Sequence, residues 1–195
     1  MPAPKALPKE VRIIGGMWKR TKLPVADKPG LRPTPDRVRE TLFNWLGQDL
    51  SGWRCVDAFA GTGALGLEAA SRGAAQVLLV EQDGDLVAKL RAMGLKLGAH
   101  AVSVQRANGL SVLKQLAPDS TDLVFLDPPF DAKIHETALK AAAQAISPQG
   151  WIYLEAPEPW DDVRLEAFGL ALHKHLRAGA VHAHLIGRRP AGPGS

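Results

Sequence analysis

The alternation of apolar runs and helical patterns between residues 53 and 155 is the feature that most limits how this chain can fold. Five runs rich in aliphatic residues alternate with four segments whose apolar residues recur at helical spacing. Strands that read as continuous apolar runs and are separated by helices form parallel sheets covered on both faces. We therefore expect strands at residues 53–58, 76–81, 101–106, 121–127 and 150–155, and helices at 64–72, 84–97, 109–116 and 132–146.

The residues before this region predict a hairpin and then a helix. Two short strands flank the pair Gly15-Gly16 within residues 11–25, and paired glycines favour a tight turn. The prolines of residues 31–35 indicate an extended connector, because a residue that precedes proline avoids the helical region. Thr34 is expected to cap the next helix, with Pro35 at its first position. One face of this helix carries Val38, Leu42, Trp45 and Leu46.

After the last apolar strand, residues 171–176 and 180–187 predict an antiparallel hairpin added to the sheet. The chain has 195 residues, of which 46% are hydrophobic, so it can form a substantial core. No uninterrupted apolar run approaches the roughly 18 residues of a membrane span, and the first residues lack the apolar stretch of a secretory signal. The single cysteine, Cys55, excludes an internal disulfide framework. We therefore expect a cytoplasmic monomer that contacts no membrane.

The net charge of +4 is unevenly distributed. The first 40 residues contain ten Lys or Arg and four acids, a net +6, whereas the remaining residues carry a net −2. An electropositive arm on a near-neutral body favours a polyanionic partner, because each neutralised phosphate releases counterions. On charge alone, a solubilising end without a ligand explains the pattern equally well.

A glycine loop follows the first strand of the alternating region. Residues 57–66 read DAFAGTGALG, with Gly61, Gly63 and Gly66 in G-x-G-x-x-G spacing. Such a loop lets the backbone approach a ligand closely and presents the N-terminal amides of the next helix. The spacing alone is equally typical of nicotinamide, flavin and S-adenosylmethionine (SAM) sites, and a plain tight turn is a further alternative.

Polar residues at the strand ends narrow that choice. Glu81 ends the second strand, 20 residues after Gly61, where its carboxylate could accept hydrogen bonds from both hydroxyls of a ribose. Asp57 stands directly before the loop, where a carboxylate would repel a pyrophosphate but suits the ammonium group of SAM. Asn108, after the third strand, could bind an adenine edge, although asparagine before glycine is also common in loops. Together these residues favour SAM.

The tetrapeptide Asp127-Pro128-Pro129-Phe130 follows the fourth strand, at the same edge of the sheet as the glycine loop. Consecutive prolines fix the backbone and remove two N–H donors, so the turn offers the Asp127 carboxylate and the Pro128 carbonyl as acceptors. Acceptors for both N–H bonds of an exocyclic amine would localise its lone pair, and the carboxylate could then take a proton. Phe130 offers a flat surface on which a base can stack. The turn predicts amino-group methylation but does not separate guanine from adenine.

The glycine loop and the Asp-Pro-Pro-Phe turn, taken together with the residues before them, resemble those of a known family. The turn is typical of class I methyltransferases that act on exocyclic amines. Residues 30–46, 59–69 and 71–74 closely resemble the bacterial 16S rRNA (guanine-966-N2)-methyltransferases, the RsmD family, and the similarity extends over residues 11–187. The resemblance implies an α/β, Rossmann-like fold: a mostly parallel seven-stranded sheet with helices on both faces and a small N-terminal β-hairpin extension. It also implies SAM-dependent methylation of a guanine N2 in 16S rRNA.

The resemblance divides the chain and assigns roles to residues. It implies an RNA-binding extension at residues 1–34, a methyltransferase domain at 35–187 and a flexible tail at 188–195. The guanine would contact Asp127, Pro128, Pro129 and Phe130, and SAM would contact Asp57, Phe59, Gly61, Thr62, Gly63, Glu81, Gln82, Asn108 and Asp127. The partner, which is 16S rRNA alone, an assembly intermediate or the small ribosomal subunit, would contact Arg12, Trp18, Lys19, Arg20, Lys22, Arg32, Thr34 and Arg37.

Other functions remain open on the sequence. A DNA adenine-N6 methyltransferase shares the turn but usually carries a separate target-recognition domain. A non-catalytic RNA-binding protein with a SAM-type fold has no need of the acids at the strand ends, and Asp57 disfavours an NAD-dependent oxidoreductase. The chemistry needs no metal, although imidazoles on facing strands could bind one; the candidates are His173, His175, His182 and His184. Cys55 is expected to be a small buried side chain rather than a nucleophile.

Overall fold

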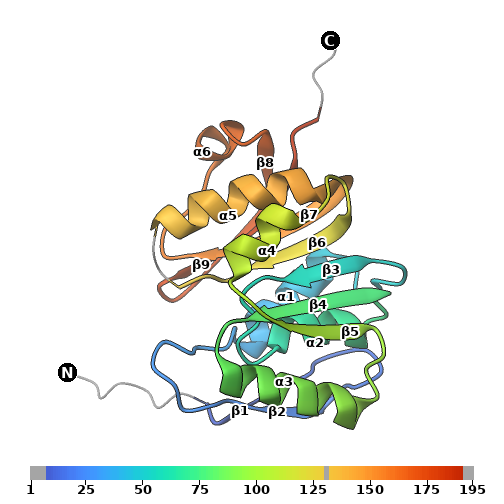
Figure 1. Cartoon of the computed structure of the whole chain (residues 1–195). Coiled ribbons are helices and arrows are strands. Elements are labelled where there is room, and N and C mark those ends of the chain that lie inside the picture. The colour runs from blue at the N-terminus through green and yellow to red at the C-terminus, as the bar shows by residue number, and fades with distance from the viewer. Residues whose placement is uncertain (1–7, 130–131, 191–195) are drawn as a thin grey trace, which may run out of the picture.

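The computed structural model describes residues 8–129 and 132–190, which form a seven-stranded sheet with helices on both faces and a separate two-stranded sheet (Figure 1). The strands of the large sheet lie in the order β5-β4-β3-β6-β7-β9-β8. These strands are β3 (Arg54–Asp57), β4 (Gln76–Glu81), β5 (Val102–Arg106), β6 (Thr121–Leu126), β7 (Ile146–Ala156), β8 (Leu170–Ala178) and β9 (Val181–Arg188).

Strands β3 to β7 pair in parallel, whereas β9 is antiparallel to both β7 and β8. The predicted parallel sheet and its appended hairpin are therefore confirmed. The chain passes from β3 outward to β4 and β5 and then returns to β6 on the other side of β3. The carboxyl ends of β3 and β6 thus flank the point where the strand order reverses, which is where open α/β sheets bind their ligands.

Helices cover the sheet because alternate residues of each strand point to opposite faces. Residues such as Phe125 and Tyr153 pack under the first set of helices, and their neighbours Val124 and Leu154 pack under the second set. The first set is α1 (Asp36–Trp45), α2 (Ala64–Ser71) and α3 (Gly84–Leu97). The second set is α4 (Gly109–Gln115), α5 (Ala132–Ala145) and the short α6 (Asp162–Glu166), which was not predicted. In the described part of the chain, no helix is long and apolar enough to cross a membrane.

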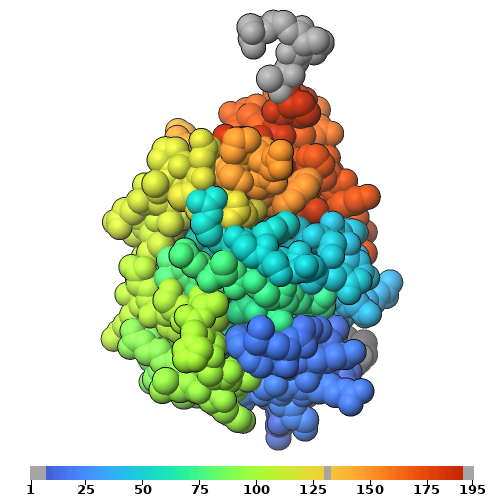
Figure 2. Space-filling view, turned by 90° about the vertical axis from the view of Figure 1, so that its right-hand side faces the viewer, coloured from blue at the N-terminus to red at the C-terminus, as the bar shows by residue number. Residues whose placement is uncertain are grey.

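The N-terminal sheet consists of β1 (Glu10–Arg12) and β2 (Lys22–Pro24), which are antiparallel as predicted. The prediction of a tight turn at Gly15-Gly16 was wrong. Residues 13–21 connect the two strands, and these glycines contact the end of α2 instead. Gly16 has a φ of +75°, and a Cβ there would lie 1.9 Å from the Ser71 carbonyl oxygen. The extension is thereby packed onto the main sheet domain, as the blue residues of Figure 2 show.

Three further boundaries differ from the expected ones. β7 begins at Ile146, where a helix was expected to end, and β9 reaches Arg188, inside the segment expected to be a tail. Pro35 rather than Thr34 is the N-cap of α1, and no side chain caps this helix. The Thr34 hydroxyl instead bonds to Glu155, so it is not available to the helix.

Candidate functional site

Four acidic residues stand at the carboxyl edge of the parallel strands, namely Asp57, Glu81, Asp127 and Glu155. The residue two positions before each of them packs in the core under α1, α2 and α3. Because side chains alternate along a strand, all four acids belong to that same face of the sheet. Burial and partners differ among them, and these differences indicate what each can do.

The glycine loop between β3 and α2 has the geometry that its spacing predicted. Gly61 and Gly63 have φ values of +53° and +79°, and Gly63 is the N-cap of α2. The backbone N–H of Gly66 donates to Asp57 Oδ2 at 3.0 Å. A Cβ on Gly66 would lie 2.2 Å from Leu79 Cδ2, so this glycine allows α2 to pack directly on the sheet.

Asp57 is fully buried at the end of β3, and its Oδ1 has no hydrogen-bond partner in the described part of the protein. Burial is the main reason that the pKa of Asp57 rises to about 7, and the nearby carboxylates of Glu81 and Glu155 raise it further. A buried carboxylate oxygen without a partner is costly unless a ligand supplies a donor. The ammonium group of SAM is a donor of the right charge, so this residue fits the predicted cofactor.

The other residues predicted to hold SAM surround the same loop. Glu81 accepts the backbone N–H groups of Gly61 and Asp83 at 3.0 and 2.9 Å and so joins the glycine loop to the start of α3. Asn108 Oδ1 accepts from Ser111 N at 3.1 Å and caps α4. Thr62 Oγ1 accepts from Ala64 N, whereas Phe59 is half-buried and Gln82 is exposed.

A second buried acidic residue, which the sequence analysis missed, lies beside the Asp-Pro-Pro turn. Glu155 is the next-to-last residue of β7, is buried, and shares a side-chain hydrogen bond with Asp127. Its Oε1 accepts from Thr34 Oγ1 at 2.5 Å and from the Tyr153 hydroxyl at 2.8 Å. The available signal was an acid at the end of a buried strand, which is the pattern that had already singled out Asp57.

Burial and the negative charges of Glu155 and Asp57 hold the pKa of Asp127 well above its usual value. Burial also raises the pKa of Glu155. None of the ion pairs of the described residues includes Asp57, Asp127 or Glu155. The site therefore combines three acids without a paired cation, which suits a positively charged ligand.

The proline turn itself is described only in part. Asp127 is half-buried, Pro128 is buried and Pro129 is exposed. The predicted stacking residue, Phe130, lies outside the described residues.

Most residues predicted to bind RNA are exposed, namely Arg12, Lys19, Arg20, Lys22, Arg32 and Arg37. Trp18 is half-buried and packs against the core, with its backbone N–H donating to Ser71 Oγ at 3.0 Å. Thr34 requires a correction, because it is buried and its hydroxyl donates to Glu155 rather than facing a phosphate.

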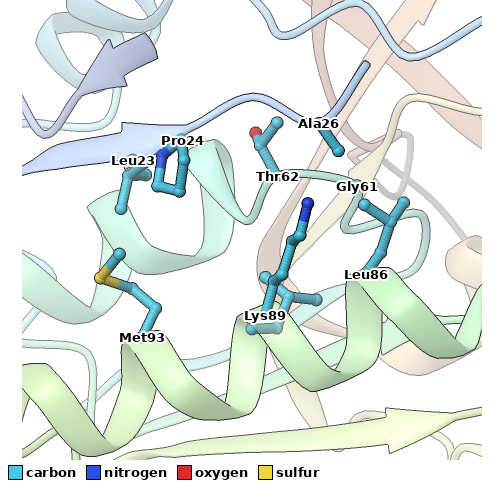
Figure 3. A pocket seen from close by; sticks show the side chains of 9 residues that line it. Leu23, Pro24, Ala26, Gly61, Thr62, Leu86, Lys89 and Met93 are labelled. Carbon is cyan, nitrogen blue, oxygen red and sulfur yellow. The ribbon is translucent and has the colours of Figure 1, made fainter. Parts of the chain in front are cut away.

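The connector between β2 and α1 crosses the edge of the sheet beside this site. Lys28 Nζ lies 2.6 Å from Asp83 and 2.9 Å from Asp85, next to the start of α3. A Cβ added to Gly61 would lie 3.1 Å from Leu31 Cδ1, so the connector contacts the glycine loop closely. Between this segment and α3, residues including Ala26, Thr62 and Lys89 line a small, partly open pocket of about 20 Å³, which has room for about one water molecule (Figure 3).

The remaining candidates behave as structural side chains. Burial raises the pKa of the Cys55 thiol to about 12, so it is not a nucleophile, as expected. His184 is buried and bonds to Trp160 N and the Leu154 carbonyl, and His175 pairs with His182 at 2.8 Å. Within residues 8–129 and 132–190, no three ligand side chains are grouped so as to hold a metal ion.

Comparisons with known proteins agree on one family. A family model described as Conserved hypothetical protein 95 matches residues 11–187, the range over which the resemblance extended. The chain is 40% identical over 189 residues to the ribosomal RNA small subunit methyltransferase D of Escherichia coli K12, covering 94% of this chain and 92% of that protein. The protein of the same name from Haemophilus influenzae is 38% identical over 180 residues, covering 85% and 92%. A solved Escherichia coli structure assigned as a methyltransferase has a TM-score of 0.79 at 36% identity and covers 93% of this chain and 99% of its own.

Proposed function

The chain belongs to the Conserved hypothetical protein 95 family, the RsmD family, and from this premise we propose that it methylates N2 of guanine-966 in 16S rRNA during assembly of the small ribosomal subunit. It is an rRNA methyltransferase with a Rossmann-like fold. The observation that carries the proposal is that two features lie at the same edge of the sheet: Asp57, whose Oδ1 has no hydrogen-bond partner among the described residues, and the Asp127-Pro128 turn, which offers acceptors.

SAM, when bound, supplies a methyl group on a positively charged sulfur that keeps the bonding electron pair as the methyl group leaves. Asp57 Oδ1 would accept a hydrogen bond from its ammonium group, and Glu81 would accept from the ribose hydroxyls. The Asn108 amide would contact the adenine edge. The remaining predicted contacts come from residues that line the loop or follow β4 and β6, namely Phe59, Gly61, Thr62, Gly63, Gln82 and Asp127.

The guanine would leave its stack to reach the crevice, as base-modifying enzymes require. The Asp127 carboxylate and the Pro128 carbonyl would accept hydrogen bonds from the two N–H groups of N2. These bonds localise the N2 lone pair and direct it toward the methyl carbon. Asp127 then takes the proton that N2 must lose. Most of the remaining rate gain would come from holding N2 and the methyl group in line. Stacking on Phe130 stays a prediction.

The N-terminal extension would bind the phosphate backbone of the rRNA. The exposed basic residues already named lie in β1, β2, the segment between these strands, the connector and the first turn of α1, and each phosphate contact there would release counterions. We infer that the chain acts in the cytoplasm on RNA or a ribosomal particle, and its monomeric state stays a prediction.

Radiolabelled methyl transfer to naked 16S rRNA, an assembly intermediate and the finished small subunit tests this function. Label on one guanine N2, located by nucleotide mapping, is the expected result. Label on adenine, or on DNA alone, would overturn the assignment.

The variant Asp127→Ala tests the role of the turn. We expect a rate loss on the order of 1,000-fold, because it removes the proton acceptor. SAM binding should still be measurable in calorimetry, because the other eight residues predicted to contact SAM remain. Asp49→Ala, in the exposed loop before β3 at the opposite edge of the sheet, is the control. An Asp127→Ala enzyme that stays active would contradict the mechanism.

A further inference from the structure

Glu155 has the contacts of a residue that organises the reacting turn. Its carboxylate is buried and contacts three side chains from three places in the chain: Thr34 from the connector, Tyr153 from its own strand, and Asp127 from the turn after β6. The register of β6 and β7 explains the last contact, since Leu126 pairs with Leu154 and the next residues are Asp127 and Glu155.

We propose that Glu155 is a positioning residue for Asp127, and that Thr34 completes this arrangement by fixing the Glu155 carboxylate from the other side. This inference rests on the proposed function, because Asp127 is the group that it positions.

The hydrogen bond between the two carboxyl groups requires one proton, since two carboxylates alone would repel each other. Thr34 and Tyr153 both donate to Glu155, which favours the ionised form of Glu155. The shared proton therefore resides mainly on Asp127, whose pKa is held well above the usual value by burial first, and then by the charges of Glu155 and Asp57 and the hydrogen bond to Glu155. Asp127 becomes a full acceptor for guanine N2 only when this proton leaves. Burial, Glu155 and Asp57 all raise the pH at which it leaves, and Glu155 does so through both its charge and its hydrogen bond.

A purely structural role would not need a charge. The hydrogen bonds that Thr34 and Tyr153 donate to Glu155 could equally be accepted by the side-chain oxygen of a glutamine. The variant Glu155→Gln therefore keeps the shape and the acceptor but removes the negative charge, whereas Glu155→Ala removes all three contacts.

The central experiment measures methyl transfer to the rRNA substrate from pH 5 to 9 for the wild type and both variants. The activity of the wild type should rise with pH as the shared proton leaves. In Glu155→Gln this rise should move to lower pH, because the charge that held the proton on Asp127 is gone and the amide can donate to Asp127. Glu155→Ala should lose about 100-fold in kcat, the typical cost of a misplaced reacting group, with an unchanged Kd for SAM.

Two additions separate positioning from general damage. Thr34→Val should lower kcat and Thr34→Ser should restore it, because serine keeps the hydroxyl that donates to Glu155. Glu136→Gln, an exposed glutamate on α5, serves as the matched control and should behave as the wild type. Superimposable pH profiles for the wild type and Glu155→Gln would overturn the proposal while leaving the methyltransferase function intact.

A readout without turnover covers failure of the function itself. The Asp127 carboxyl carbon, labelled with ¹³C and assigned by comparison with Asp127→Asn, can be titrated by NMR in the free protein. Its midpoint should fall in Glu155→Gln. If the wild type methylates no rRNA, the proposed function fails, and an unchanged midpoint would separately refute the role of Glu155.

Discussion

Two buried glutamates join the N-terminal extension to the main sheet domain, and their partners are opposite in kind. Glu68, on α2, accepts the backbone N–H groups of Ile14 and Gly15 at 2.8 Å each. It also contacts two guanidinium groups, Arg39 at 3.3 Å and Arg72 at 3.0 Å. Glu155 receives hydroxyl groups and a second carboxyl group instead.

The difference separates structure from chemistry. The Glu68 charge is neutralised and its oxygens are bonded, which is the arrangement of an ion pair that fastens two segments. The Glu155 cluster leaves its negative charge uncompensated, and protein interiors retain such groups mainly where a ligand or a reaction uses them. The first prediction below tests this difference directly, and the next two test the Asp57 side of the site, which also has no paired cation among the described residues.

The largest effect is expected from Glu68→Ala. This change leaves the Arg39 guanidinium, which is fully buried, with one acidic partner fewer, and losing one partner of a buried pair typically costs 3–5 kcal/mol. Urea denaturation should report this loss. The kcat of the protein that remains folded should stay near the wild-type value, and a loss of activity without a loss of stability would erase the distinction between the clusters.

Asp57 should make the folded protein less stable as pH rises. Its folded pKa of about 7 lies above the unfolded value near 4, so the folded state holds this proton more tightly. Its contribution is therefore fully present below pH 4 and is lost as pH rises to 7, by at most about 4 kcal/mol.

Asp57→Asn should remove this loss, so the variant gains stability relative to the wild type between pH 4 and 7. Burial lowers the pKa of His184 to about 4 and gives a slope of the other sign, so only the difference between the two proteins is diagnostic. Thermal melts over this range measure it, and parallel curves would show that Asp57 is ionised in the free protein.

The smallest effect is expected from Gly66→Ala, which perturbs the Asp57 side of the site by packing alone. The new methyl group would lie 2.2 Å from Leu79 Cδ2 and 3.2 Å from Asp57 Oδ2, an overpacking that typically costs 1–3 kcal/mol. Gly94→Ala is the control, since that helical glycine has nothing within 4 Å and alanine there should stabilise α3. Equal melting temperatures for the two variants would contradict the close approach of α2 and the sheet.

The parts of the fold that depend on local pattern could be predicted from the sequence. Apolar strands alternating with helices determine a parallel sheet, and the glycine spacing determines the loop, so Asp57 and Asp127 were found at strand ends. Glu155 was missed although it also lies at the carboxyl end of a strand, because no motif surrounds it.

The contacts that could not be predicted join residues far apart in the chain. Thr34 looked like a helix cap because its neighbours suggested one, but a carboxylate 121 positions later takes its hydroxyl. Gly15 and Gly16 looked like a hairpin turn, but Glu68 and Ser71 bind this segment to α2. Local propensity is overridden in both places by a partner that only the folded chain brings near.

The connector between β2 and α1 has a thermodynamic consequence. It contacts the glycine loop through Leu31 and Glu155 through Thr34, and it continues into the basic hairpin. A segment shared by two sites couples their equilibria, and such coupling is reciprocal. If bound rRNA tightens the affinity for SAM by some factor, bound SAM must tighten the affinity for rRNA by the same factor. The free protein would then exchange SAM more readily than the RNA-bound protein, so use of the methyl donor would follow the supply of substrate.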